Sequence, residues 1–137
     1  MKYRDVEYEI VIWDWLWTLY SRQDNRLFYW VEEYFKKYGR ESRNFLVSYA
    51  FAPEKRKALI ERFGIEGYFE KIVIEKGDKE ELFSKIIEKY SLDKTKILVI
   101  GDNVLHEGVA AKKLGLKYLP IAVWNEHLVT ELGIRGK

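Results

Sequence analysis

The chain has 137 residues, with 24 basic and 22 acidic side chains and a formal net charge of +2 at neutral pH. This length fits one compact domain, and an apolar share of 47% with 34% charged residues is typical of a soluble globular protein. We therefore predict a single domain over residues 1–137. The small net charge argues against a nucleic-acid partner, and no apolar run approaches the ~20 residues that cross a membrane.

Cysteine is absent and only two histidines are present, which excludes disulfides, thiolate nucleophiles and an unaided zinc centre. Any metal must then be held mainly by oxygen ligands, which favour Mg²⁺. The first residues mix charges and lack the apolar segment of a secretory signal, so we expect a cytoplasmic protein. Abundant lysine and glutamate favour a heat-stable, thermophile-type chain.

Five short apolar runs alternate with helical patterns along the chain and are predicted to be strands. They are Tyr8–Asp14, Asn44–Ser48, Lys71–Ile74, Ile97–Gly101 and Tyr118–Val123. Several runs are apolar on successive residues, which indicates strands covered on both faces, as in a parallel sheet between helices. The predicted fold class is α/β, a three-layer α/β/α, Rossmann-like open parallel sheet of about five strands.

Four helices are predicted between these strands from caps, apolar periodicity and terminal glycines. Their ranges are Asp24 to about Tyr38, Pro53 to about Gly64, Lys79–Tyr90 and about Leu105–Leu114. The connections leave no room for an inserted cap domain, so a site on this fold should be open to solvent.

Polar residues fall where the predicted strands end. Asp14, Ser48 and Asp102 close strands or follow them, and Lys79 opens the helix after another strand. Ligands of open parallel sheets bind outside the carboxyl ends of the strands. These residues are therefore the candidates for a functional site.

The segment Ile10–Leu19 resembles the first motif of the haloacid dehalogenase superfamily, Asp-x-Asp-x-Thr after a hydrophobic strand, with Asp14 and Thr18 at its ends. Ser48, Lys79 and the Gly-Asp pair ending at Asp102 then follow in the order of the second, third and fourth motifs. The chain is thus similar to a small, capless, phosphatase-like member of that superfamily.

This resemblance implies a Mg²⁺-dependent phosphohydrolase in which Asp14 attacks phosphorus and becomes an aspartyl phosphate. It implies Mg²⁺ ligation by Asp14, Asp102 and the backbone carbonyl of Leu16, with the hydroxyl of Ser48 and the ammonium of Lys79 on the phosphoryl oxygens. Thr18 would brace the loop. The implied substrate is a small phosphorylated molecule or a phosphoprotein.

Leu16 departs from the motif, because it stands where the phosphatases carry the second aspartate, their general acid and base. General acid-base catalysis is worth ~10² to 10⁴ in rate, so turnover should be slow unless the leaving group needs little protonation. The alternative is a catalytically degenerate domain that binds phosphate, magnesium or a protein partner.

Several residues are compatible with more than one role. Lys76 competes with Lys79 for the cationic role, and Glu107 either serves the metal region or is a solvated helix residue. Asn103 is a further candidate beside Asp102. The basic run Lys55–Lys57 either meets an anionic substrate or, as we favour, forms a solvated helix face. The open site, together with the many aromatic residues between the first and second predicted strands, is also compatible with a homo-oligomer.

Overall fold

The computed structural model describes residues 1–135 and confirms the predicted five-stranded parallel sheet. Its strands, in spatial order, are β7 (Lys71–Glu75), β6 (Arg43–Tyr49), β3 (Ile10–Trp13), β8 (Ile97–Gly101) and β9 (Lys117–Pro120). In the central strand, Ile12 is in register with Phe45 on one side and Val99 on the other. The carboxyl ends of β3, β6 and β8 therefore meet at one edge.

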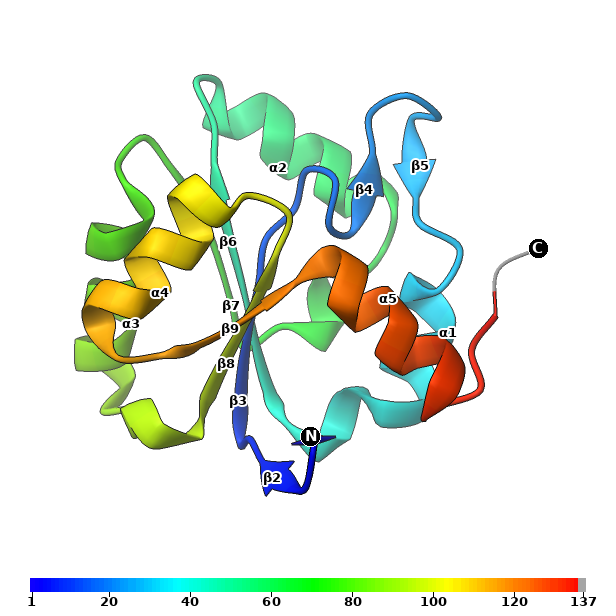
Figure 1. Ribbon diagram of the computed structural model, residues 1–137. Helices are drawn as coiled ribbons and strands as arrows, with labels where there is room; N and C mark the ends of the chain where they lie inside the picture. Colours follow the sequence, from blue (N-terminus) through cyan, green and yellow to red (C-terminus); the bar gives the residue numbers. More distant parts are fainter. Residues whose placement is uncertain (136–137) are drawn as a thin grey trace.

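Helices cover both faces of the sheet (Figure 1). Three helices pack on one face: α1 (Val31–Tyr38), α2 (Pro53–Arg62) and α5 (Ile121–Thr130). On the other face lie α3 (Lys79–Tyr90) and α4 (Val109–Leu114). Side chains of β3 alternate between the two cores, with Trp13 in the first and Ile12 in the second. This explains why every residue of the strand is apolar.

An aromatic cluster fills the core under α1 and α5. The Trp13 ring lies 5.3 Å from that of Trp124 and 5.8 Å from that of Trp30, and Tyr34 and Phe35 complete the cluster. All five side chains are buried. Most of the aromatic residues before β6 are thus buried in the core, and few of them are left for a surface between subunits.

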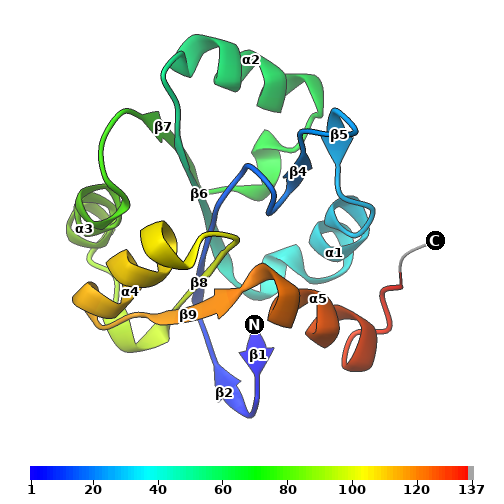
Figure 2. The ribbon, with the colours of Figure 1, turned by 45° about the horizontal axis from the view of Figure 1, so that its top comes forward.

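The segment predicted to begin a helix at Asp24 is instead a small hairpin, made by β4 (Tyr20–Ser21) and β5 (Arg26–Leu27) (Figure 2). The turn places Asn25 at φ 51°, a left-handed conformation that asparagine tolerates. Asp24 accepts a hydrogen bond from the Ser21 hydroxyl in this turn. It therefore shapes the turn, and α1 begins only at Val31.

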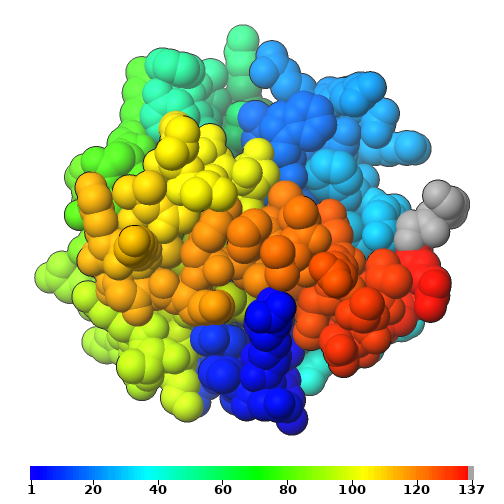
Figure 3. Space-filling model, viewed as in Figure 1, coloured from blue at the N-terminus to red at the C-terminus, as the bar shows by residue number. Residues whose placement is uncertain are grey.

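The fifth strand was predicted to run to Val123, but it ends at Pro120, and α5 starts at Ile121. Proline has no N–H to continue the ladder and suits the start of a helix. Trp124 and Leu128, four residues apart, bury one face of α5. Figure 3 shows the N-terminal residues, in dark blue, lying against this helix.

The remaining elements are short. The N-terminal hairpin consists of β1 (Lys2–Tyr3) and β2 (Val6–Glu7). Single turns of 3₁₀-helix occur as η1 (Gly39–Glu41), η2 (Glu66–Tyr68) and η3 (Lys94–Lys96), and a π-turn, η4 (Val104–Gly108), precedes α4. Within residues 1–135, no helix combines the length and apolarity that crossing a bilayer requires.

Replacing Trp124 by alanine tests whether α5 is part of the core. The indole is fully buried among four aromatic rings, so the change should lower the free energy of unfolding by about 3–5 kcal/mol. Urea denaturation measures this loss. Phe51→Ala is the control, because that ring is 78% exposed and its removal should cost less than about 0.5 kcal/mol.

Candidate active site

Asp14 follows the central strand at the carboxyl edge of the sheet. Its amide donates to the carbonyl of Ile100 at 3.1 Å, which extends the pairing with β8 by one residue. Thr18 donates from its hydroxyl to Oδ2 of Asp14 at 3.3 Å. The loop between them closes on itself, since the amides of Leu19 and Tyr20 both donate to the Trp15 carbonyl. Asp14 is therefore buried and fixed in orientation.

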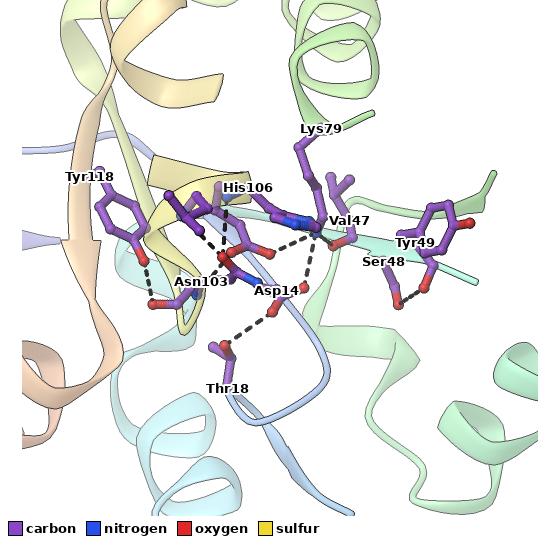
Figure 4. A network of polar contacts seen from close by, with 12 residues as sticks. Asp14, Thr18, Val47, Ser48, Tyr49, Lys79, Asn103, His106 and Tyr118 are labelled. Atoms are coloured by element: carbon purple, nitrogen blue, oxygen red, sulfur yellow. Dashed lines mark hydrogen bonds and ion pairs between the residues drawn. The ribbon is translucent and has the colours of Figure 1, made fainter. Parts of the chain in front are cut away.

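Lys79 is the first residue of α3, and its side chain reaches back to the strand ends (Figure 4). Nζ lies 2.9 Å from Oδ1 of Asp14, 2.7 Å from the carbonyl oxygen of Val47 and 3.4 Å from Oε1 of Glu107. The side chain of Asp78 caps the helix and so sets where it starts. Lys76 is exposed on the preceding connection. Of the two competing lysines, Lys79 is the one that lies at Asp14.

Glu107, in the π-turn, is buried rather than solvated. Besides its contact with Lys79, its Oε2 accepts a hydrogen bond from the Asn103 amide at 3.0 Å. A Cβ at Gly101 would lie 3.0 Å from Cγ of Glu107, so the glutamate packs directly on that backbone. Burial, followed by the charge of Asp14, raises the pKa of Glu107, and Lys79 opposes this shift.

Asp102 extends the cluster towards solvent. It is exposed, and one oxygen of its carboxylate lies within 4.8 Å of one oxygen from each of Asp14 and Glu107, which are themselves within this distance of each other. Desolvation and the two neighbouring acids raise the pKa of Asp102 to about 7. Tyr118 donates to the Gly101 carbonyl at 2.9 Å and holds the backbone just before Asp102.

Three convergent carboxylates are a suitable donor set for a hard divalent cation such as Mg²⁺. Among the described residues, no hydrogen bond ends on the backbone carbonyl of Leu16, so this oxygen is free to join the set. The Leu16 side chain itself packs against the aromatic core. The residues present therefore fit a metal, although their proton-transfer chemistry is reduced by the leucine.

Ser48 is the penultimate residue of β6 and is buried beside Val47. Its hydroxyl oxygen accepts a hydrogen bond from Nη1 of Arg56 at 2.6 Å, and the same nitrogen lies 3.4 Å from the carbonyl oxygen of Tyr49. Arg56 is half-buried. The expectation of a wholly solvated basic face on this helix is therefore wrong for Arg56, although Lys55 and Lys57 are exposed.

Asn103 and His106 take no part in the cluster through their side chains. The Asn103 carboxamide caps the π-turn by accepting from the amides of Leu105 and His106, at 3.0 and 3.2 Å. His106 is exposed. The sequence singled out Asn103 for its position beside Asp102, but its side chain shapes the turn while its backbone holds Glu107.

A groove of about 510 Å³ opens beside Lys79, between the start of α3 and α4. Its walls include the apolar side chains of Tyr49, Leu105 and Val109, all of them well exposed. Phe51 is also exposed at the end of β6. The edge of the sheet that carries Asp14 is therefore open and partly apolar.

The clustered acids predict a pH-dependent response to Mg²⁺. Because the folded state raises the pKa of Asp102 from 3.8 to about 7, it binds more protons than the unfolded chain in this range. The metal-free protein should lose stability as pH rises from 4 through 7. Mg²⁺ should restore it, so the rise in unfolding temperature on adding Mg²⁺ should be larger at pH 8 than at pH 5.

Thermal unfolding monitored by circular dichroism measures this response. Asp102→Asn should abolish most of the pH dependence and most of the Mg²⁺ effect. An equal Mg²⁺ effect in this variant and in the wild type would exclude Asp102 as a ligand.

Comparison with known proteins places these residues in a family. The model for "Haloacid dehalogenase-like hydrolase" matches residues 23–121, a range that includes Ser48, Lys79 and Asp102 but starts after Asp14. No curated protein sequence matches the chain. Several solved structures share the fold.

A hydrolase from Streptococcus pneumoniae TIGR4 is 18% identical, with a TM-score of 0.73 over 94% of this chain and 100% of its own. A Clostridium difficile protein, provisionally described as a phosphatase, is 14% identical with a TM-score of 0.74, over 84% and 85% of the two chains. The haloacid dehalogenase-type hydrolase YfnB of Bacillus subtilis, solved with magnesium, is 14% identical with a TM-score of 0.62, over 69% and 43%. The family match spans most of the sequence, and the chain belongs to the haloacid dehalogenase-like hydrolases.

Proposed function

We propose that the protein is a Mg²⁺-dependent phosphohydrolase that works through an aspartyl phosphate on Asp14. The observation that carries this proposal is the buried contact of Lys79 with both Asp14 and Glu107, next to the carboxylate of Asp102. A fixed carboxylate with a cation beside it and a divalent site in front of it is what in-line attack on a phosphate monoester requires.

In the first step, a carboxylate oxygen of Asp14 attacks phosphorus, and the bond from phosphorus to the ester oxygen breaks. The leaving oxygen departs with the bonding electron pair. Lys79 on Oδ1 and Thr18 on Oδ2 hold the carboxylate in one orientation before attack. Fixing a reactant in this way removes part of the entropic cost of the step.

Mg²⁺, when bound, supplies positive charge that offsets repulsion between the carboxylate and the phosphate dianion. Asp14, Asp102 and the Leu16 carbonyl would hold it, as proposed from the sequence. The resemblance to the haloacid dehalogenase superfamily implies an aspartate at position 107; the longer Glu107 contacts Lys79 at 3.4 Å and the Asn103 amide. It thereby positions both the lysine and the backbone that follows Asp102.

In the second step, water attacks the aspartyl phosphate at phosphorus, releases inorganic phosphate and regenerates Asp14. In the usual phosphatases, a general base takes the proton of this water. Leu16 offers no such group, so this proton passes to solvent in our proposal. Turnover is then limited by proton transfer, at a cost of ~10² to 10⁴ in rate.

The same leucine selects the leaving group. An alkoxide must be protonated as it departs, whereas an aryl or acyl phosphate releases an anion that is stable enough to leave unprotonated. The apolar groove with Tyr49, Leu105 and Val109 also suits an aromatic or otherwise apolar leaving group. We therefore propose aryl or acyl phosphates, on a small molecule or a protein, as the better substrates.

The first test is hydrolysis of p-nitrophenyl phosphate with Mg²⁺. The wild type should hydrolyse it measurably and hydrolyse an alkyl phosphate far more slowly. Asp14→Asn should lower kcat by at least about 10³, because the amide cannot act as the nucleophile. Asp5→Asn is the matched control, because it makes the same change at an aspartate that is fully exposed in the N-terminal hairpin. Activity that survives in Asp14→Asn removes this residue from the mechanism.

A second candidate function, favoured by Leu16, is a domain that binds phosphate, Mg²⁺ or a protein without turnover. Leu16→Asp discriminates between the two. If the chain is an enzyme, this change should raise hydrolysis of an alkyl phosphate by ~10² to 10⁴ and that of an aryl phosphate by much less.

Leu16→Asn is the matched control, since it is polar but does not transfer protons. A wild type without activity on any phosphate, turned into a strong phosphatase by Leu16→Asp alone, would favour the binding domain. Initial rates over a series of leaving groups provide the measurement.

A further inference from the structure

Arg56, on the helix that follows Ser48, is a cation near the site that has no role in the proposed reaction. It lies in the first turns of α2, and its guanidinium reaches the end of β6. Nη1 donates to Oγ of Ser48 at 2.6 Å, and this serine is the proposed hydroxyl for the phosphoryl oxygens. Arg56 therefore lies beside Ser48, at the carboxyl end of β6.

Arg56 is half-buried, yet no carboxylate of the described residues forms an ion pair with it. Among the ion pairs within residues 1–135, none includes Arg56. Burial lowers the pKa of this guanidinium, and the charge of Asp14 acts against that shift. Placing a cation where it loses water without gaining an ion pair is costly. Such a group is expected where the missing anion is a ligand.

The guanidinium also keeps donors in reserve. Arginine carries five N–H donors in a planar fork, and both hydrogen bonds that the Arg56 guanidinium donates within residues 1–135 leave from Nη1. Nε and Nη2 have no partner among these contacts. A fork with free N–H groups suits the oxygens of a phosphoryl group, which arginine binds in a bidentate manner.

The charge of Lys79 is already committed. It contacts Asp14 and Glu107, and Asp102 adds a third carboxylate to the same cluster. A divalent cation and Lys79 would together balance these three acids. An incoming phosphoryl dianion would then bring two negative charges with no further cation to meet them. Arg56 supplies one.

We propose that Arg56 is a phosphate-binding residue that contacts a non-bridging oxygen of the phosphoryl group directly. This inference rests on the proposed function, because it assumes that the phosphoryl group lies between Asp14 and Ser48. Oγ of Ser48 accepts from Arg56, and its hydroxyl donates only a long hydrogen bond of 3.5 Å to the Tyr49 carbonyl, which it can exchange for one to another phosphoryl oxygen. Arg56 and Ser48 thus act on the same group from one side, and Lys79 acts on it from the other.

The test measures the affinity for inorganic phosphate with Mg²⁺ by calorimetry, together with KM and kcat for p-nitrophenyl phosphate. Arg56→Ala should weaken phosphate binding by about 10- to 100-fold, the loss expected for a hydrogen bond between charged groups. It should raise KM for the aryl phosphate as well. Arg56→Lys keeps the charge without the fork and should lose less. Lys57→Ala, the exposed neighbour on the same helix, should change phosphate affinity by less than about twofold.

A double-mutant cycle separates direct contact from support of Ser48. If Arg56 touches phosphate, Arg56→Ala should still weaken binding in a Ser48→Ala background. No further loss in that background would overturn the direct contact, as would unchanged phosphate affinity in Arg56→Ala or Arg56→Lys. Unfolding temperatures identify a variant that fails to fold, in which case Arg56→Lys decides.

The outcomes also distinguish this inference from the function on which it rests. Phosphate binding that depends on Arg56, without any turnover, would exclude the proposed hydrolase function and support Arg56 as a phosphate-binding residue. Turnover through Asp14 with phosphate affinity independent of Arg56 would sink the assignment alone. A wild type that neither binds phosphate nor hydrolyses an ester would overturn both.

Discussion

The ammonium of Lys79 is the interaction on which the rest of the site depends. It lies between Asp14 after β3, the carbonyl of Val47 in β6 and Glu107 in η4, while its own backbone begins α3. Four elements distant in sequence therefore meet at one buried charge. Removing one partner of a buried ion pair leaves the other uncompensated, which is strongly destabilising. The lysine thus assembles the carboxyl edge of the sheet as well as serving it.

This arrangement leaves the site with more acid than base. Three carboxylates face one ammonium, and the pKa values of Asp102 and Glu107 are raised first by burial and then by the charges of the neighbouring acids. Binding a cation relieves the repulsion, and binding a phosphate then demands still more positive charge. An ordinary second aspartate at position 16 would add a fourth negative group. The leucine therefore removes proton transfer, but it also lowers the electrostatic cost of the cluster.

The sheet and the main site positions follow from sequence because both depend on local pattern. Runs that are apolar on successive residues, such as Ile97–Gly101, indicate parallel strands buried on both faces. Asp14, Lys79 and Asp102 stand after such strands, where ligands of parallel sheets bind. The sequence did not reveal the features that depend on contacts between distant elements of the fold. Arg56 is separated from Ser48 by eight residues, and only the packing of α2 brings them together. Pro120 indicates where the last strand ends. The apolar residues that follow it are compatible with either a strand or a helix, and only the four-residue spacing of Trp124 and Leu128 favours the helix.

Gly101 and Glu107 together restrict how this sequence can vary. The glutamate side chain lies against the glycine backbone so closely that a methyl group there would meet Cγ at 3.0 Å and Cδ at 3.2 Å. A shorter aspartate would withdraw its carboxylate from Lys79, but its own Cβ and Cγ would still occupy the positions nearest to Gly101. Alanine at 101 would therefore require the acidic side chain at 107 to give way by a few tenths of an ångström, whichever acid stands there. The glycine thus leaves the space in which the acid reaches the buried lysine, so a side chain added at 101 should be felt first at the contact between Glu107 and Lys79.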